Sequence, residues 1–142
     1  MEVRDVMTGH VITVGQGESV NAAVALLKRY NLGALPVCDA AGRLRGMVTD
    51  RDIVLRCLGQ GADPAATKIS EIMSRGIVTA DSGDSVASAA ETMARDRVRR
   101  LPVTENGALV GMLSVCDLAR HERCAAECGQ ALRAISANVI RY

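Results

Sequence analysis

The chain contains one series of short motifs twice, in the same order. Leu-Pro-Val stands at residues 35–37 and again at 101–103, and a glycine-led segment follows each of them, Gly46–Asp52 and Gly111–Asp117. A repeat of this size rarely buries its apolar face alone. We therefore expect the two copies to pack as a pseudo-two-fold pair, with equivalent clefts between the halves.

Each copy predicts a strand, a helix, two strands and a second helix. Runs of valine and isoleucine indicate the strands, and apolar residues at helical spacing indicate the helices. The expected elements of the first copy are a strand at 11–14, a helix at 20–30, strands at 34–38 and 44–48, and a helix from 49 to about 58. Those of the second copy are a strand at 77–79, a helix at 85–96, strands at 101–104 and 109–113, and a helix from 114. Helices that cover one face of small mixed sheets define an α+β fold.

The expected boundaries follow the repeat. Residues 1–62 form the first copy with a short lead-in, residues 63–122 form the second copy, and residues 123–142 form a C-terminal helical extension. The chain of 142 residues is long enough for these parts to share one domain.

The composition indicates a folded protein without a strong electrostatic field. Apolar residues make up 49% of the chain and the formal net charge is +1, so neither nucleic acid nor a membrane is an expected partner. The chain has two Tyr and neither Phe nor Trp, which removes the aromatic platforms on which single-stranded nucleic acid stacks. No apolar run approaches the roughly 20 residues of a membrane span, and the N-terminus lacks a signal sequence. We expect a cytoplasmic protein with reduced cysteines.

A Ser/Thr-x-x-Asp pattern begins the last predicted helix of each copy, as Thr49 with Asp52 and as Ser114 with Asp117. Two interpretations of these pairs stay open. The pattern is a capping box, which satisfies the first backbone amides of a helix. The same groups also suit a ligand with sugar hydroxyls and a phosphate, because a carboxylate accepts hydrogen bonds from both hydroxyls and a helix start favours an anion.

These doubled motifs resemble the CBS domain pair, also called a Bateman module, of the stand-alone bacterial type. The resemblance rests on Asp-Val-Met-Thr at 5–8 and Glu-Ile-Met-Ser at 71–74, on the two Leu-Pro-Val strands, and on the two closing Gly-x-x-Thr/Ser-x-x-Asp segments. It implies a regulatory module without enzyme activity. The ligand implied is an adenosine-containing molecule (AMP, ADP, ATP, S-adenosylmethionine or NAD) bound in clefts between the two copies, with no other cofactor required.

The resemblance also implies roles for individual residues. Asp52 and Asp117 would accept hydrogen bonds from ribose hydroxyls, and the closing motif of one copy would meet the opening of the other. Two sets of residues follow: Ser114 and Asp117 with Thr8, Ile12, Leu32, Gly33 and Ala34, and Thr49 and Asp52 with Ser74, Val78, Val98 and Arg99. Ser114 in the first set and Thr49 in the second would contact a phosphate of the ligand.

Several members of these sets keep a structural interpretation. The apolar residues suit an ordinary core, and Gly33 suits the end of a helix. Arg99 suits a solvated face, although family members often place a phosphate-facing cation at this position. Because the first copy has Gly33 where the second has Arg99, the two clefts are expected to differ.

Other functions remain as alternatives. The chain has no phosphate-binding loop and no nucleophile–base–acid set, which argues against an enzyme. One alternative is a structural dimer that docks a partner with empty clefts. Another is a thiol or metal sensor, since Cys116, His121, Cys124 and Cys128 follow one another at about one helical turn.

The resemblance further implies a symmetric homodimer formed through helices. Apolar side chains on the helices that follow the closing motifs are the candidate contacts: Val54, Leu55, Leu58, Leu118 and Ala119. A downstream protein partner is expected, and the sequence does not identify it.

Overall fold

The computed structural model describes residues 1–137 and consists of two compact units. Unit 1 combines Met1–Val11 with the chain from Val78 onward, and unit 2 comprises Ile12–Ile77. The lead-in of the chain therefore folds with the second copy of the repeat. Residues 138–142 of the expected C-terminal extension lie outside the described residues.

Unit 2 is a three-stranded sheet with its own helices. Its strands lie in the order β1-β2-β3, with β1 parallel to β2 and β2 antiparallel to β3. The elements in chain order are β1 (Val14–Gly15), α2 (Val20–Tyr30), β2 (Ala34–Cys38), β3 (Leu44–Thr49), α3 (Asp50–Asp52), a π-helical turn (Ile53–Cys57), a 3₁₀ turn (Leu58–Gln60) and α4 (Ile69–Ile72).

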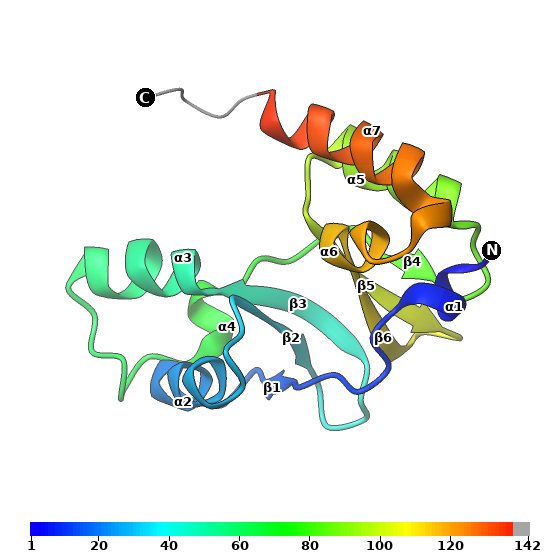
Figure 1. The fold of residues 1–142 in the computed structure, drawn as a ribbon. Helices are drawn as coiled ribbons and strands as arrows, with labels where there is room; N and C mark the ends of the chain where they lie inside the picture. The colour runs from blue at the N-terminus through cyan, green and yellow to red at the C-terminus, as the bar shows by residue number, and fades with distance from the viewer. Residues whose placement is uncertain (138–142) are drawn as a thin grey trace. The chain divides into compact units, whose positions relative to one another are not determined.

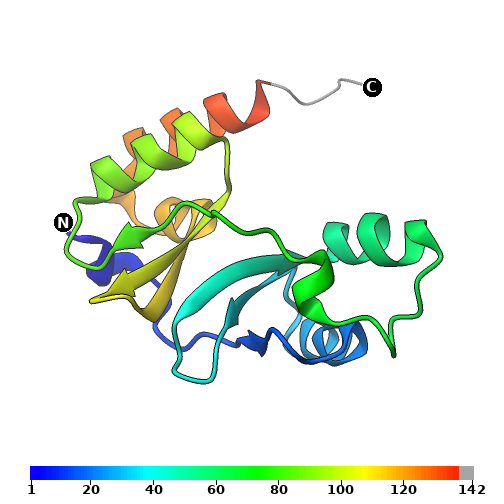
Figure 2. The ribbon, with the colours of Figure 1, turned by 180° about the vertical axis from the view of Figure 1, so that it is seen from behind.

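Unit 1 repeats this plan and adds a helix. Its strand order β4-β5-β6 has the same parallel and antiparallel pairings. Its elements are α1 (Val3–Val6), β4 (Ala80–Asp81), α5 (Val86–Asp96), β5 (Arg100–Glu105), β6 (Ala108–Ser114), α6 (Val115–Ala119), a 3₁₀ turn (Glu122–Cys124) and α7 (Ala125–Ser136). Helix α7 packs along α5, as Figures 1 and 2 show. The α+β class predicted from the sequence is confirmed.

The first strand of each copy begins later than the sequence predicts. The strands expected at 11–14 and 77–79 are wrong, because pairing begins only at Val14 and Ala80. The β-branched residues before these points lie where the chain passes from one unit to the other. Residues with high strand propensity form a strand only where a neighbouring strand is available for pairing, and these residues pair with none.

Each unit buries a separate hydrophobic core. Unit 2 packs α2 and the π-helical turn on its sheet around Leu35, Val48 and Cys57, all fully buried. In unit 1, Leu118 is fully buried among the β5 and β6 side chains. The prediction that Leu118 offers a surface for dimerisation is therefore wrong, whereas Val54, Leu55 and Leu58 are each about half exposed.

Serines begin α2 and α5, and residues in the left-handed conformation end them. Ser19 accepts a hydrogen bond from the backbone of Ala22, and Ser85 does the same for Ser88. Asn31 ends α2 and Arg97 ends α5, with φ of 53° and 54°. The interpretation of Gly33 as the helix cap is therefore wrong, because Asn31 takes that conformation two positions earlier.

Arg97 provides a test of this geometry. A side chain in the left-handed region is strained, and glycine relieves that strain although it also gains freedom in the unfolded chain. We expect Arg97→Gly to raise the free energy of unfolding by about 0.5–1 kcal/mol, measured by urea denaturation. Asn31→Gly is the matched control and should change stability less, since asparagine tolerates this conformation. A loss of stability in Arg97→Gly would contradict the assignment.

Candidate functional site

The predicted Asp52 forms a capping box at the start of α3. Its Oδ2 accepts a hydrogen bond from the backbone N–H of Thr49 at 2.9 Å, and its own N–H donates to Oγ1 of Thr49 at 3.0 Å. The structure therefore bears out the capping interpretation in unit 2. It also leaves the second carboxylate oxygen, Oδ1, outside the capping box.

Asp117 repeats this arrangement in unit 1. Its Oδ2 accepts from the backbone N–H of Ser114 at 2.8 Å and from the Ser114 hydroxyl at 3.0 Å, and its N–H donates to Ser114 Oγ at 3.1 Å. Asp117 is one of only two buried polar or charged residues in the described chain, at 6% exposure. One oxygen again holds the start of the helix, and the other lies outside the capping box.

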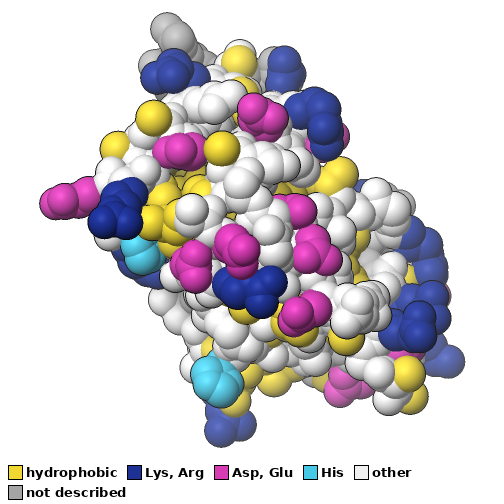
Figure 3. All heavy atoms as spheres, turned by 90° about the vertical axis from the view of Figure 1, so that its right-hand side faces the viewer, with side chains coloured by type: hydrophobic (Ala, Val, Ile, Leu, Met, Phe, Trp, Pro, Cys, Tyr) yellow, Lys and Arg dark blue, Asp and Glu magenta, His cyan; other side chains and the backbone are white. Residues whose placement is uncertain are grey.

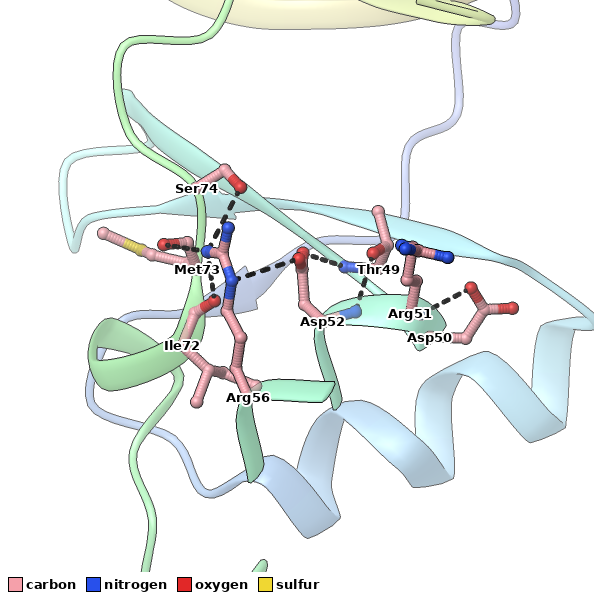
Figure 4. A network of polar contacts seen from close by, with 8 residues as sticks. All are labelled: Thr49, Asp50, Arg51, Asp52, Arg56, Ile72, Met73 and Ser74. Carbon is pink, nitrogen blue, oxygen red and sulfur yellow. Dashed lines mark hydrogen bonds and ion pairs between the residues drawn. The ribbon is translucent and has the colours of Figure 1, made fainter. Parts of the chain in front are cut away.

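Oδ1 of each aspartate meets side chains from elsewhere. Asp117 Oδ1 accepts from Arg120 Nη1 at 3.1 Å and from the Thr8 hydroxyl at 3.5 Å. Asp52 Oδ1 lies 3.8 Å from Arg56 Nε. Figure 4 shows Arg56 between Asp52 and the segment Ile72–Ser74, where its Nη1 also contacts Ser74 Oγ at 3.5 Å.

The opening segments reach these aspartates by pairing with a strand. Thr8 exchanges two backbone hydrogen bonds with Met112 of β6, both of 2.9 Å. Ser74 exchanges two with Met47 of β3, at 3.0 and 2.8 Å. The structure therefore brings Thr8 to Asp117, whereas Ser74 is linked to Asp52 only through Arg56, which contacts both.

Two strand glycines permit this approach. A Cβ atom on Gly111 would lie 2.5 Å from Met7 Sδ and 2.9 Å from the carbonyl oxygen of Thr8, and one on Gly46 would collide with the carbonyl oxygen of Ser74. A side chain at either position would push the opening segment away from the strand. The glycine of each closing motif therefore has a packing reason.

Gly33, Ala34 and Arg99 lie beside the closing motif of their own copy. The Gly33 carbonyl accepts the Asp50 N–H at 3.0 Å, and Ala34 pairs with Thr49 across β2 and β3. The Arg99 carbonyl likewise accepts the Val115 N–H at 2.9 Å. The sequence prediction assigned these segments to the opposite copy and did not foresee this neighbourhood. Ile12 and Leu32 belong to unit 2, and Val78 and Val98 belong to unit 1.

Sequence reasoning missed Arg56 and Arg120. The only available signal is their position, four residues after Asp52 and three after Asp117, which places them one helical turn further on. The pattern alone does not distinguish such a residue from any solvated arginine.

The cysteine cluster does not form as expected. Helix α6 ends at Ala119 and a 3₁₀ turn precedes α7, so no single helical face carries Cys116, His121, Cys124 and Cys128. Cys124 and Cys128 are buried, whereas Cys116 is exposed. Burial, followed by the charge of Glu127, raises the pKa of the Cys124 thiol and keeps it protonated and less reactive. Among residues 1–137, no group of three or more His, Cys, Asp or Glu side chains is placed to hold a metal ion.

Charge is mixed on the surface. Acidic and basic side chains both occur across the face in Figure 3, with hydrophobic atoms between them. Within residues 1–137, no helix is both long and apolar enough to span a bilayer.

Comparison with known proteins defines the class. The CBS domain model matches residues 3–59 and 69–123. The CBS domain-containing protein YhcV of Bacillus subtilis is 40% identical to the chain, with 94% of both chains covered. The chain therefore belongs to the CBS domain family and contains a pair of CBS domains.

Relatives of known structure share this fold. Hypoxic response protein 1 of Mycobacterium tuberculosis is 38% identical over 83% of the chain and 82% of the relative. A crystal structure of hypoxic response protein I with two coordinated zinc ions has a TM-score of 0.80 at 37% identity, covering 85% of this chain and 98% of that one. The CBS domain pair of protein MJ0100, solved with 5′-methylthioadenosine and S-adenosylmethionine, has a TM-score of 0.75 at 29% identity, covering 84% and 94%.

Gly111→Ala tests how the site is held together. We expect the added methyl group to collide with Met7 and Thr8 and to lower the free energy of unfolding by about 1–3 kcal/mol, as overpacking does. The measurement is urea denaturation. Gly9→Ala is the matched control in the same opening segment, because a Cβ there meets nothing within 4 Å. Equal effects of the two substitutions would contradict the close approach at Gly111.

Proposed function

We propose that the protein is a non-enzymatic regulatory module that binds an adenosine-containing ligand at Asp52 and Asp117. The observation that carries the proposal is the repeated arrangement in the two units. In each unit a carboxylate has one oxygen fixed by a capping box and the other paired with an arginine, and in unit 1 the Thr8 hydroxyl also contacts that second oxygen. The complex of MJ0100 with two adenosine-containing molecules supports this ligand class.

The chemistry of the aspartates suits a ribose. A carboxylate oxygen accepts hydrogen bonds from hydroxyl groups, and a charged acceptor makes these bonds stronger than neutral ones. The capping box pre-orients Asp52 and Asp117, so little side-chain freedom is lost when a ligand binds. We propose that Thr49 and Ser114 contact a phosphate of the ligand.

The remaining predicted residues complete the proposed sites. The base would contact the apolar and backbone groups of the predicted sets, namely Ile12, Leu32, Gly33, Ala34, Val78 and Val98. Arg99 is exposed and its backbone is anchored to Val115, so its side chain is free to extend toward a phosphate. Because the first copy has Gly33 in place of Arg99, the two sites are proposed to bind with different affinity.

The cellular setting follows from the same proposal. A module of this kind acts by passing ligand occupancy to a downstream protein, and we propose a cytoplasmic location, where adenine nucleotides and S-adenosylmethionine occur. The thiol alternative is not favoured, because Cys124 is buried with a raised pKa.

Thermal stability in the presence of ligand tests the function. We expect at least one of AMP, ADP, ATP and S-adenosylmethionine to raise the melting temperature of the wild-type protein. A ligand at about 100 times its Kd adds about 2.7 kcal/mol, which corresponds to several degrees for a chain of this length.

The matched variant is the double substitution Asp52→Asn with Asp117→Asn. Asparagine keeps the size and much of the capping geometry but removes the charged acceptor, so the ligand-free protein should lose about 0.5–2 kcal/mol per site at most. The ligand-dependent rise in melting temperature should disappear. If the ligand raises the melting temperature of the double variant as much as that of the wild type, both residues serve in helix capping alone.

We also propose that the protein forms a homodimer through unit 2. Val54, Leu55 and Leu58 are 54%, 48% and 55% exposed on one helical segment. Stable monomers rarely expose neighbouring large apolar side chains as one continuous patch. A second copy would cover them with an identical face.

Sedimentation at micromolar concentration tests this assembly. We expect the mass of a dimer for the wild-type protein and that of a monomer for Leu55→Glu, because a charge in the centre of an apolar interface is costly. Leu132→Glu is the control, since Leu132 is similarly exposed at 47% but lies on α7. A wild-type monomer would contradict the proposal.

A further inference from the structure

An arginine occupies the outward oxygen of both proposed ribose-binding aspartates. Arg120 Nη1 lies 3.1 Å from Asp117 Oδ1, and Arg56 Nε lies 3.8 Å from Asp52 Oδ1. These are the oxygens that the capping boxes leave for a ligand. In the ligand-free chain the acceptor therefore already has a charged partner in each unit.

The two arginines do not correspond in the repeat. When the closing motifs are aligned on Asp52 and Asp117, Arg56 matches His121 and Arg120 matches Leu55. The pairs have i,i+4 spacing in unit 2 and i,i+3 spacing in unit 1. Each copy thus pairs its aspartate with an arginine, but from a different position in the repeat. Duplication of one ancestral salt bridge does not explain this difference.

The aspartates and the arginines differ strongly in exposure. The side chains of Asp52 and Asp117 are 14% and 8% exposed, whereas those of Arg56 and Arg120 are 51% and 73% exposed. An ion pair with an exposed partner contributes little free energy and breaks readily. Each arginine can therefore leave its aspartate while remaining close enough to meet another part of the same ligand.

We propose that Arg56 and Arg120 make the sites selective for adenosyl ligands that carry a phosphate. This inference rests on the proposed function. When a nucleotide binds, its ribose hydroxyls replace the guanidinium at the aspartate, and its phosphate takes up the released guanidinium. An uncharged adenosine or methylthioadenosine must displace the arginine without offering it a new partner, and it binds more weakly for that reason.

Unit 1 offers the cleaner test of this selectivity. Arg56 also donates to the carbonyl oxygen of Ile72 at 3.1 Å and contacts Met73 and Ser74 (Figure 4), so its loss also affects the packing of the opening segment. The Arg120 side chain donates to Asp117. Substitution of Arg120 therefore changes the site with less risk to the fold.

The experiment is isothermal titration with AMP and with adenosine, in an Asp52→Asn background that leaves only the unit 1 site. Addition of Arg120→Gln should tighten adenosine binding about two- to fivefold, because an exposed ion pair no longer has to break. It should weaken AMP binding about tenfold, because a charge-assisted hydrogen bond to the phosphate is lost. Arg120→Lys keeps the charge without the planar guanidinium, so its affinity for AMP should lie between that of the parent protein and that of Arg120→Gln.

Arg123→Gln is the matched control in the same background. It removes the same charge from an exposed position next to α7, away from the closing motif, and should change the affinities for AMP and adenosine by the same small factor. The reciprocal series uses Arg56→Gln in an Asp117→Asn background, with Arg51→Gln as its control. Arg51 is exposed on the same helical segment.

Two outcomes overturn the proposal, and they are distinguishable. If both ligands bind and Arg120→Gln leaves the ratio of their affinities unchanged, the arginine is a surface partner of the capping residue and the selectivity is refuted, while the proposed function stands. If the wild-type protein binds neither ligand, the proposed function fails and the selectivity fails with it.

Discussion

One oxygen of a capping carboxylate holds the first helical turn after the closing motif in each unit, and the other oxygen lies outside the capping box. This division ties stability and ligand chemistry to the same residue. The side chains of Asp52 and Asp117 have to hold a fixed rotamer to close the turn at Thr49 and Ser114. The same constraint keeps the outward oxygen in one place, where a hydroxyl donor finds it already oriented.

The opening segments depend on this geometry and also complete it. Thr8 reaches Asp117 only because residues 1–11 fold with the second copy, and Ser74 lies near Asp52 only because the segment before the second copy folds with the first. Gly46 and Gly111 permit both approaches. A single copy cut from the chain at the repeat boundary would therefore keep its aspartate and lose the opening segment that pairs with its strand.

The sequence predicted the parts of the fold that local chemistry determines. Apolar residues at helical spacing indicated α2 and α5, and the Ser/Thr-x-x-Asp pattern located both aspartates. Features that depend on distant neighbours were missed. The strands at 11–14 and 77–79 were wrong because β propensity does not reveal whether a partner strand is present. Leu118 was assigned to a surface because helical spacing does not say which face the sheet covers.

The candidate site shows the same limit. Repeat comparison located the aspartates and the opening hydroxyls because both copies carry them at equivalent positions. It could not locate Arg56 and Arg120, because the copies supply their guanidinium groups from positions that do not align. Such a feature becomes visible only when the side chains are placed in space.

A crystal structure of the protein grown with AMP tests the central claim most directly. The ribose hydroxyls should lie within hydrogen-bond distance of Oδ1 of Asp52 or Asp117, with Oδ2 still in its capping box. The arginine of that site should have turned from the aspartate to the phosphate. A nucleotide bound elsewhere, with both aspartate–arginine pairs intact, would contradict the assignment of these carboxylates to ligand binding.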